Sequence, residues 1–298
     1  MKPERNRERR QSVQSADTVV AVLKGLARLG GRATLTALAS SIDENPAKLH
    51  RYLVSLIDGG LVIQDPVSQH YILGLDTMLI GLAAMHQADP IRIAEPGLIA
   101  LCDQLQITSF IAVMGNKGPT IVRMEEPMLP VTVNVRVGSV LPLLTSATGR
   151  VFLGMHDEPL VRRIANDEFN RYVHSRRVLS PQGAYDPNVV RLNPEQAEIP
   201  ELGESLDTLI AKVQQDISRY HCTTVIDTNL KGISAVAAPI FNFAGQVAAV
   251  VTVLGASGSF DTTLTGPTAN TVRDQAQRIS RQLGFVDGPP NAMAGNRQ

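Results

Sequence analysis

The side chains best suited to recognising another molecule lie between positions 45 and 55, on one face of an expected helix. They are polar or charged: Asn45, Lys48, His50, Arg51 and Ser55. Lysine and arginine can meet phosphates or guanine edges, while the other three add hydrogen-bonding groups. Such a set near the N-terminal half of a helix fits the major groove of DNA. The pattern indicates a DNA-reading face, and the alternative is an ordinary solvated face of two packed helices.

Two short helices are expected to position this face. The first is predicted by apolar residues at helical spacing after a capping Thr34: Leu35, Leu38, Ala39 and Ile42. Asn45 followed by Pro46 starts a second helix, because asparagine caps free amides and proline suits the first helical position. The buried face of that helix is formed by Leu49, Tyr52, Leu53, Leu56 and Ile57.

A hairpin is expected directly after the second helix. Residues 61–63 and 70–73 predict two short strands around a turn at Asp65 and Pro66, and Gly74 ends the second strand. Gln69 and His70 would then reach the minor groove or the DNA backbone. With a further helix over 16–29, these elements form a winged helix-turn-helix domain over residues 15–74.

An apolar helix follows this domain, over about 75–90. Its apolar residues line one side: Leu75, Met78, Leu79, Leu82 and Met85. Its place between two domains predicts a linker or dimerisation helix. The alternative is a helix buried within the core of a single chain.

The remainder, residues 91–285, is expected to form an α+β domain. Strands are predicted at 107–114, 120–126, 130–137, 223–226, 234–241 and 246–254, and helices at 92–104, about 145–155, 202–220 and 265–283. This order favours an antiparallel sheet covered by helices that cups a ligand. The small-residue turn at 145–149 opens a helix whose amides suit an anion, although a plainly capped helix is common. Residues 168–201 read as mostly irregular, as in a lid, a binding loop or a mobile insertion.

Length and composition limit the class of protein. The 298 residues suffice for about two domains, and 44% hydrophobic with 19% charged residues is ordinary for a soluble globular protein. Apolar stretches are too short to span a membrane and no secretory segment is evident, so we expect a cytoplasmic protein. With two cysteines and no Cys-x-x-Cys, neither a disulfide framework nor a zinc site is expected, and no cofactor is implied.

Positive charge gathers at the N-terminus although the net charge is zero. Among residues 1–32, lysine and arginine exceed acidic residues by five, which fits nucleic-acid contact at that end. Residues 1–14 are expected to form a disordered basic arm, and residues 286–298 a disordered tail.

An enzyme is not expected. The six histidines are scattered, and no Gly-x-Ser-x-Gly or P-loop pattern occurs. His221 and Cys222 are neighbours on a strand, so their side chains would point to opposite faces, and Cys222 is best read as a buried structural residue. A non-catalytic alternative stays open, namely a ligand-independent DNA-binding or protein-interaction module.

Several stretches, in this order and spacing, resemble the IclR family of bacterial transcriptional regulators over nearly the whole chain. They are LHRYL at 49–53, YILG at 71–74, GSVLPL at 138–143, and GISAVAAPIF at 232–241 followed by VVTVLG at 250–255. The resemblance implies a winged helix-turn-helix, a linker helix and a GAF-like effector-binding domain. It also implies a dimer or tetramer on double-stranded operator DNA, repressing or activating, whose affinity changes when a small organic effector binds.

The resemblance also implies an effector pocket. Its residues would be Val133, Ala147, Thr148, Val225, Ala235, Thr252 and Leu254. Val225, Ala235 and Leu254 stand where relatives that bind small keto acids can have acidic, thiol or hydroxyl groups. We hypothesise a more apolar pocket for an aromatic or larger carboxylic acid, with its carboxylate near Thr148. Ala47-Lys48 and Asp227-Thr228 also depart from the family pattern.

Overall fold

A computed structural model describes residues 13–87, 89–127, 135–155, 158–177, 205–228 and 231–286. The chain divides into two compact units, Met1–Ala88 and Asp89–Gln298, called unit 1 and unit 2 below. Several expectations lie wholly or mostly outside the described residues: the basic arm, the C-terminal tail, the strand over 130–137, and 178–201 of the segment read as irregular.

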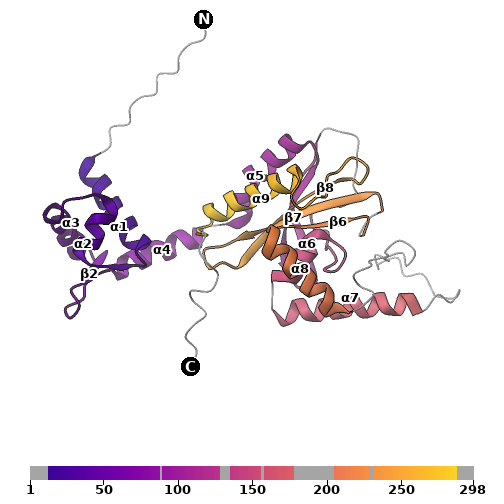
Figure 1. The fold of residues 1–298 in the computed structure, drawn as a ribbon, viewed down its shortest axis with the longest axis horizontal. Coiled ribbons are helices and arrows are strands. Elements are labelled where there is room, and N and C mark those ends of the chain that lie inside the picture. Colours follow the sequence, from indigo (N-terminus) through magenta and orange to yellow (C-terminus); the bar gives the residue numbers. More distant parts are fainter. Residues whose placement is uncertain are drawn as a thin grey trace, which may run out of the picture. The chain divides into compact units, whose positions relative to one another are not determined.

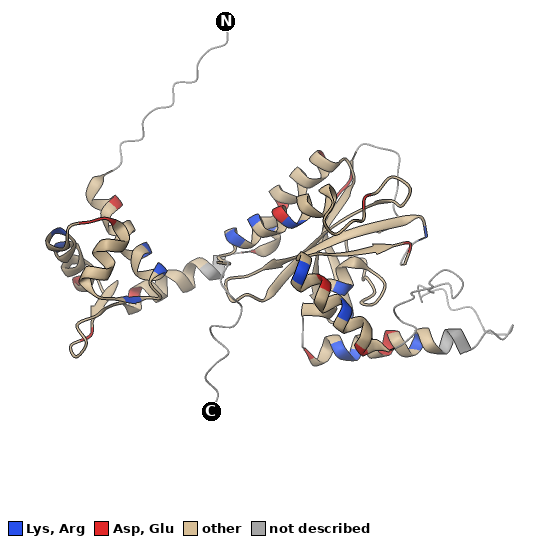
Figure 2. Cartoon of the chain, in the orientation of Figure 1, with Lys and Arg blue, Asp and Glu red and all other residues tan. Residues whose placement is uncertain are grey.

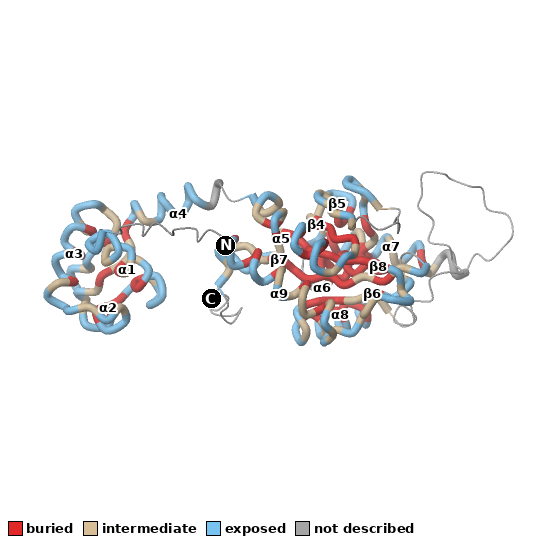
Figure 3. The backbone as a smooth tube through the Cα atoms, turned by 90° about the horizontal axis from the view of Figure 1, so that it is seen from above, coloured by how far each residue is buried: buried red, intermediate tan, exposed pale blue. Residues whose placement is uncertain are grey.

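Unit 1 is a winged helix-turn-helix (Figure 1). Its elements are α1 (Gln14–Arg28), β1 (Arg32–Ala33), α2 (Leu35–Ile42), α3 (Pro46–Asp58), β2 (Val62–Gln64), β3 (Tyr71–Leu73) and α4 (Leu75–Gln87). The strands form an antiparallel sheet in the order β1-β3-β2. Leu26 of α1, Leu38 of α2 and Leu53 of α3 are fully buried in a common core. The expected apolar faces therefore do pack together, as the burial colours of Figure 3 show.

Helix α4 is attached at the base of the wing, by which we mean β2, β3, the turn between them and the residues that directly flank the two strands. The Thr77 hydroxyl donates to the carbonyl of Leu61 over 2.7 Å. Gly74 precedes the helix where only glycine fits, because an added Cβ would lie 2.1 Å from the Gly60 carbonyl oxygen. Beyond this attachment the helix exposes four large apolar side chains by more than half: Leu75, Met78, Leu79 and Ile80. The side chain of Met85 lies outside the described part.

Unit 2 is built on a five-stranded antiparallel sheet in the order β5-β4-β8-β7-β6. The strands are β4 (Thr108–Gly115), β5 (Gly118–Glu125), β6 (Thr223–Ile226), β7 (Ile233–Phe241) and β8 (Val247–Ala256). Side chains alternate between the faces, so Val250 and Val251 belong to different apolar clusters. The predicted α+β class with an antiparallel sheet is confirmed.

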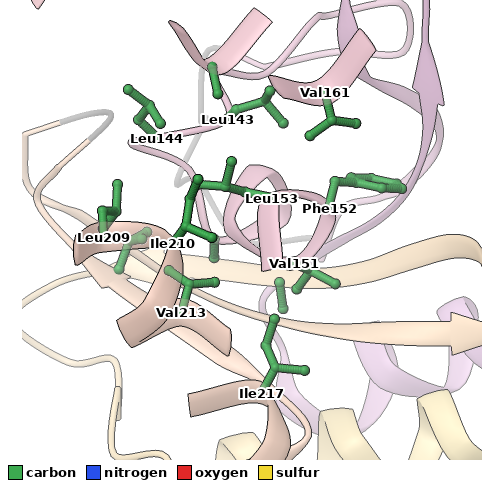
Figure 4. Close-up of a cluster of buried hydrophobic side chains, with 14 of the residues drawn as sticks. Leu143, Leu144, Val151, Phe152, Leu153, Val161, Leu209, Ile210, Val213 and Ile217 are labelled. Atoms are coloured by element: carbon green, nitrogen blue, oxygen red, sulfur yellow. The ribbon is translucent and has the colours of Figure 1, made fainter. Parts of the chain in front are cut away.

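Helices cover both faces of this sheet (Figure 1). Helices α5 (Pro90–Leu105) and α9 (Pro267–Gln282) lie on one face, and α6 (Ala147–Met155) and α8 (Leu206–Tyr220) on the other. Figure 4 shows the cluster on the second face, which includes Val161, Phe152 of α6 and Val213 of α8. The start of α6 packs within this cluster.

Two expectations about unit 2 are wrong. His221 and Cys222 do not lie on a strand, because His221 directly follows α8 and β6 begins at Thr223. Helix α7 spans Pro159–Arg177, so residues 168–177 are helical and not irregular. Its apolar stripe is narrow, because Arg, Asp and Asn fill the other faces, and it is formed by Val161, Ile164, Ala165, Phe169 and Tyr172. Packing of this stripe against α6 and α8 stabilises a helix that composition alone does not reveal.

Candidate functional site

The exposed face of α3 carries the expected DNA-reading residues. Ala47, His50, Arg51, Val54 and Ser55 are exposed, while Leu49, Leu53 and Leu56 face the core. The Arg51 guanidinium makes no hydrogen bond or ion pair with any part of the chain that the structure describes. It is therefore available to a partner. The Ser55 hydroxyl donates to the Arg51 carbonyl over 3.4 Å and keeps its lone pairs free.

Asn45 and Lys48 have local partners at the start of α3. The Asn45 Oδ1 accepts from the amides of Ala47 and Lys48, over 2.9 and 3.4 Å, which is the expected N-cap. The Lys48 Nζ donates to the Glu44 carboxylate over 2.7 Å, and this bond raises the pKa of Lys48 and lowers that of Glu44. A contact of Lys48 with DNA would thus compete with an existing ion pair.

The wing turn is held by side chains that were expected to meet DNA. The Gln69 Nε2 donates to the Pro66 carbonyl over 2.9 Å, and its Oε1 accepts from Gln64 over 3.1 Å. The His70 Nδ1 lies 2.9 Å from the carbonyl oxygen of Ser68. Both residues therefore shape the turn, and the outer edge of the His70 ring remains for contact with a partner.

The structure brings six of the seven residues implied as effector ligands into one pocket of unit 2. They are Ala147 and Thr148 from α6, Val225 from β6, Ala235 from β7, and Thr252 and Leu254 from β8. Val133 lies outside the described residues. The space between the pocket walls is about 390 Å³, a volume that includes the part open to solvent.

Five further residues line this pocket and were missed by sequence reasoning. They are Phe110, Val135, Leu141, Ser146 and Ile233. Phe110 comes from β4, which pairs with β8, and Phe110 lies opposite Thr252 in that pairing. The mostly apolar run of β4 predicted a strand, but no local signal shows which strand lies beside it. Most of the lining is apolar, as the substitutions at Val225, Ala235 and Leu254 led us to expect.

Two threonine hydroxyls supply the polar group of the pocket. Thr148 Oγ1 and Thr252 Oγ1 lie 2.7 Å apart, and each residue is 1% exposed. Two hydroxyls have two hydrogens and use one of them between themselves, so one O–H remains for an acceptor on a ligand. The Ser146 hydroxyl is already engaged, since it donates to the Pro142 carbonyl and accepts from the Gly149 amide.

The turn before α6 is held by a carboxylate from α7. Glu168 accepts from the Leu143 amide with both oxygens, over 3.0 and 2.9 Å, and from the Leu144 amide over 3.1 Å. Burial raises the pKa of Glu168, and the amide bonds oppose that rise. An internal carboxyl group thus occupies the amides just before the turn where we expected an external anion. The polar group that the pocket itself presents is the Thr148–Thr252 pair.

Close packing at Gly149 and a hydrogen bond from Thr228 also hold the turn before α6. Gly149 lies so near the preceding loop that an added Cβ would be 2.0 Å from the Pro142 carbonyl oxygen. The Thr228 hydroxyl donates to the Thr145 carbonyl over 2.6 Å. Asp227, in a left-handed conformation with φ of 55°, accepts from the Gly232 amide over 2.9 Å. The Asp227-Thr228 pair therefore joins the β6–β7 connection to the pocket wall.

Neither metal nor membrane chemistry is indicated in the described part of the chain. No group of three or more His, Cys, Asp or Glu side chains there could hold a metal ion. Among the same residues, no helix combines the length and apolar character needed to cross a membrane.

Comparison with known protein families assigns a domain to each unit. Residues 15–66 match the IclR helix-turn-helix domain. Residues 206–281 match the domain described as bacterial transcriptional regulator IclR C-terminal. The first match covers nearly all of α1, then α2, α3 and β2, and it ends before β3, whereas the second covers α8, three strands of the sheet and nearly all of α9.

Individual proteins are similar over almost the whole chain. HmgR of Pseudomonas aeruginosa is 32% identical with a TM-score of 0.78, over 93% of this chain and all of that one. The repressor BlcR of Agobacterium tumefaciens shares the fold, with 15% identity and a TM-score of 0.67 over 93% of this chain and 99% of BlcR. The HTH-type transcriptional repressor AllR of Salmonella paratyphi A is 24% identical over 283 residues, covering 95% of this chain and 93% of AllR.

Proposed function

Because the chain belongs to the IclR family of bacterial transcriptional regulators, we propose how its DNA-binding function is exerted and which class of ligand controls it. The protein is a DNA-binding transcription regulator and not an enzyme. In our proposal, α3 enters the major groove of a pseudo-palindromic operator, and a small organic acid bound in unit 2 changes the affinity. The observation that carries the ligand class is an apolar pocket with one buried hydroxyl pair.

Arg51 is proposed as the main base or phosphate contact. It is exposed on the outer face of α3 and, unlike Lys48, has no ion-pair partner in the described residues. The Arg51→Ala variant should lose about 1 to 3 kcal/mol of operator binding if the guanidinium reads a base. Fluorescence anisotropy with an operator fragment measures this, and operator binding equal to wild type would reject the role.

A homodimer is proposed to hold two copies of α3 in successive major grooves. Leu75, Met78, Leu79 and Ile80 are exposed on α4, which is attached to the wing. Burial of these side chains against the same helix of a second chain would remove them from water. Sedimentation of the full chain tests this, since a Leu79→Asp variant should shift the protein toward monomer. A wild-type protein that sediments as a monomer at micromolar concentration would contradict the proposal.

The ligand is proposed to be an aromatic or larger apolar carboxylic acid. Phe110, Val225 and Leu254 would contact its apolar body, and the free hydroxyl of the Thr148–Thr252 pair would donate to its carboxylate. Titration with benzoate and phenylacetate should show saturable binding and a change in DNA affinity. Tight binding of pyruvate or glyoxylate, without binding of the aromatic acids, would sink the proposal.

The alternative is a regulator that works without a ligand. Thermal denaturation against a panel of organic acids separates the two, because a ligand that binds only the folded state raises the melting temperature. The pocket predicts at least one such acid. Stabilisation by none of the panel, with DNA binding intact, would favour the ligand-independent module.

A further inference from the structure

The wing of unit 1 has no positive charge of its own. Residues 59–74 contain no lysine or arginine, and their one acidic residue is Asp65. In Figure 2 the loop between β2 and β3 shows acidic colour and no basic colour. Contacts between cations and phosphates supply most of the sequence-independent affinity for DNA. A wing that lies against the backbone therefore needs a cation from elsewhere in the fold.

We infer that Arg32 of β1 supplies this cation and is the phosphate contact of the wing. Arg32 pairs with Ile72 of β3, so its side chain starts beside the wing. Its Nη2 donates to the Ser68 hydroxyl over 2.8 Å and lies 3.7 Å from the Asp65 carboxylate. The guanidinium is thereby brought to the wing turn. This inference rests on the DNA-binding function of unit 1.

The guanidinium remains free enough to bind a phosphate. Its side chain is 51% exposed, and one of its five N–H groups is used by Ser68. The other donors keep the planar arrangement that suits two phosphate oxygens. An arginine held in place by one hydrogen bond loses less conformational entropy on binding than a free one.

The neighbouring Asp65 mainly holds the turn. Its Oδ1 accepts from the amides of Val67 and Ser68, over 2.8 and 3.0 Å, and these bonds lower its pKa more than Arg32 does. The contact between Asp65 and Arg32 is long and exposed, and such ion pairs contribute little. The guanidinium can therefore turn toward a phosphate without disrupting the turn.

The test is a salt titration of the full chain on a mixed-sequence DNA duplex, followed by fluorescence anisotropy. Arg32→Gln removes the charge but keeps a donor for Ser68, and Arg32→Lys keeps the charge. Arg278→Ala on α9 is the control, because it removes an exposed arginine from unit 2. Melting of each variant verifies that the wing is folded.

The expected result is a smaller salt dependence for Arg32→Gln. The slope of log affinity against log salt should fall in magnitude by about 0.9 for each protomer bound. Over a fourfold rise in salt, wild type should then lose about 3.5-fold more affinity per protomer than the variant. Arg32→Lys and Arg278→Ala should retain the wild-type slope.

Two other results are distinguishable. A wild-type slope in folded Arg32→Gln, with wild type itself binding the duplex, overturns the role of Arg32 and leaves the DNA-binding function intact. An equal loss of slope in Arg278→Ala also overturns the role of Arg32, because the salt dependence would then be set by the net charge of the protein and not by one contact. Failure of wild type to bind the duplex even at low salt would contradict the DNA-binding function itself.

Discussion

Replacing Glu168 by alanine should destabilise unit 2 through the turn that it holds. The carboxylate accepts from the amides of Leu143 and Leu144, and both residues are almost fully buried, at 0% and 2% exposure. Alanine would leave both amides without a partner and without water. Each buried unsatisfied amide costs about 1 to 3 kcal/mol, so the loss of both should lower the free energy of unfolding by about 2 to 6 kcal/mol.

Urea unfolding followed by circular dichroism measures this change, and the denaturation midpoint should fall with little change in slope. Asp167→Ala is the matched control, because it removes an exposed carboxylate from the neighbouring position of α7. Surface substitutions of that kind usually change stability by less than about 0.5 kcal/mol. If Glu168→Ala unfolds within the same margin as Asp167→Ala, the proposed role of the amide bonds is refuted.

The pH dependence of Glu168→Gln tests the charge state. Burial raises the pKa of Glu168 above its ordinary value of 4.5, so the folded state binds the proton more tightly than the unfolded state does. The corresponding stability is present below pH 4.5 and is lost as the pH rises through the folded pKa. The advantage of wild type over the non-titrating glutamine variant should therefore shrink as pH rises. An advantage that grows would show that the amide bonds outweigh burial.

Three further substitutions test the start of α6 and the pocket wall. Alanine is favoured over glycine in helices by about 1 kcal/mol, yet Gly149→Ala should destabilise by roughly 1 to 3 kcal/mol through overpacking, because its Cβ would meet the Pro142 carbonyl at 2.0 Å. Gly81→Ala in α4, where an added Cβ meets nothing within 4 Å, should stabilise; thermal melts that show gains for both would contradict the packing argument. Thr148→Val and Thr252→Val should each cost about 1 to 3 kcal/mol, because each strands the other hydroxyl, whereas the double variant should cost less than their sum. Strictly additive losses in a double-mutant cycle would exclude a coupled hydroxyl pair.

The helices and strands that the sequence predicted are those with strong local signals. The side chains of Thr34 and Asn45 cap their helices as their types require, and apolar runs bounded by turn residues indicated the sheet strands. Helix α7 was missed because its apolar face is narrow and most of its other residues are charged or polar. Packing against α6 and α8 decides that helix, and such packing has no local pattern.

The candidate site was predictable from the sequence only where a residue type has one common role. Arg51 is exposed as expected, but Asn45 and Lys48 show that capping and pairing residues are of the same types as DNA-contacting ones. The resemblance to the family identified six residues that the structure places in one pocket. The bond from Glu168 to Leu143 spans 25 positions, and no spacing rule predicts such a contact.

The strand order of unit 2 has a consequence for how the chain folds during synthesis. Ser109 of β4 pairs with Val253 of β8, so almost half of the chain lies between two adjacent strands. Unit 1 is a compact unit of its own, Met1–Ala88, and can fold as soon as that part leaves the ribosome. The β4–β5 hairpin must wait with one unpaired edge until β8 is made, and unpaired edges favour aggregation. During synthesis the DNA-binding unit is thus complete before the unit that should control it. In that interval unit 2 has an unpaired strand edge that is open to aggregation.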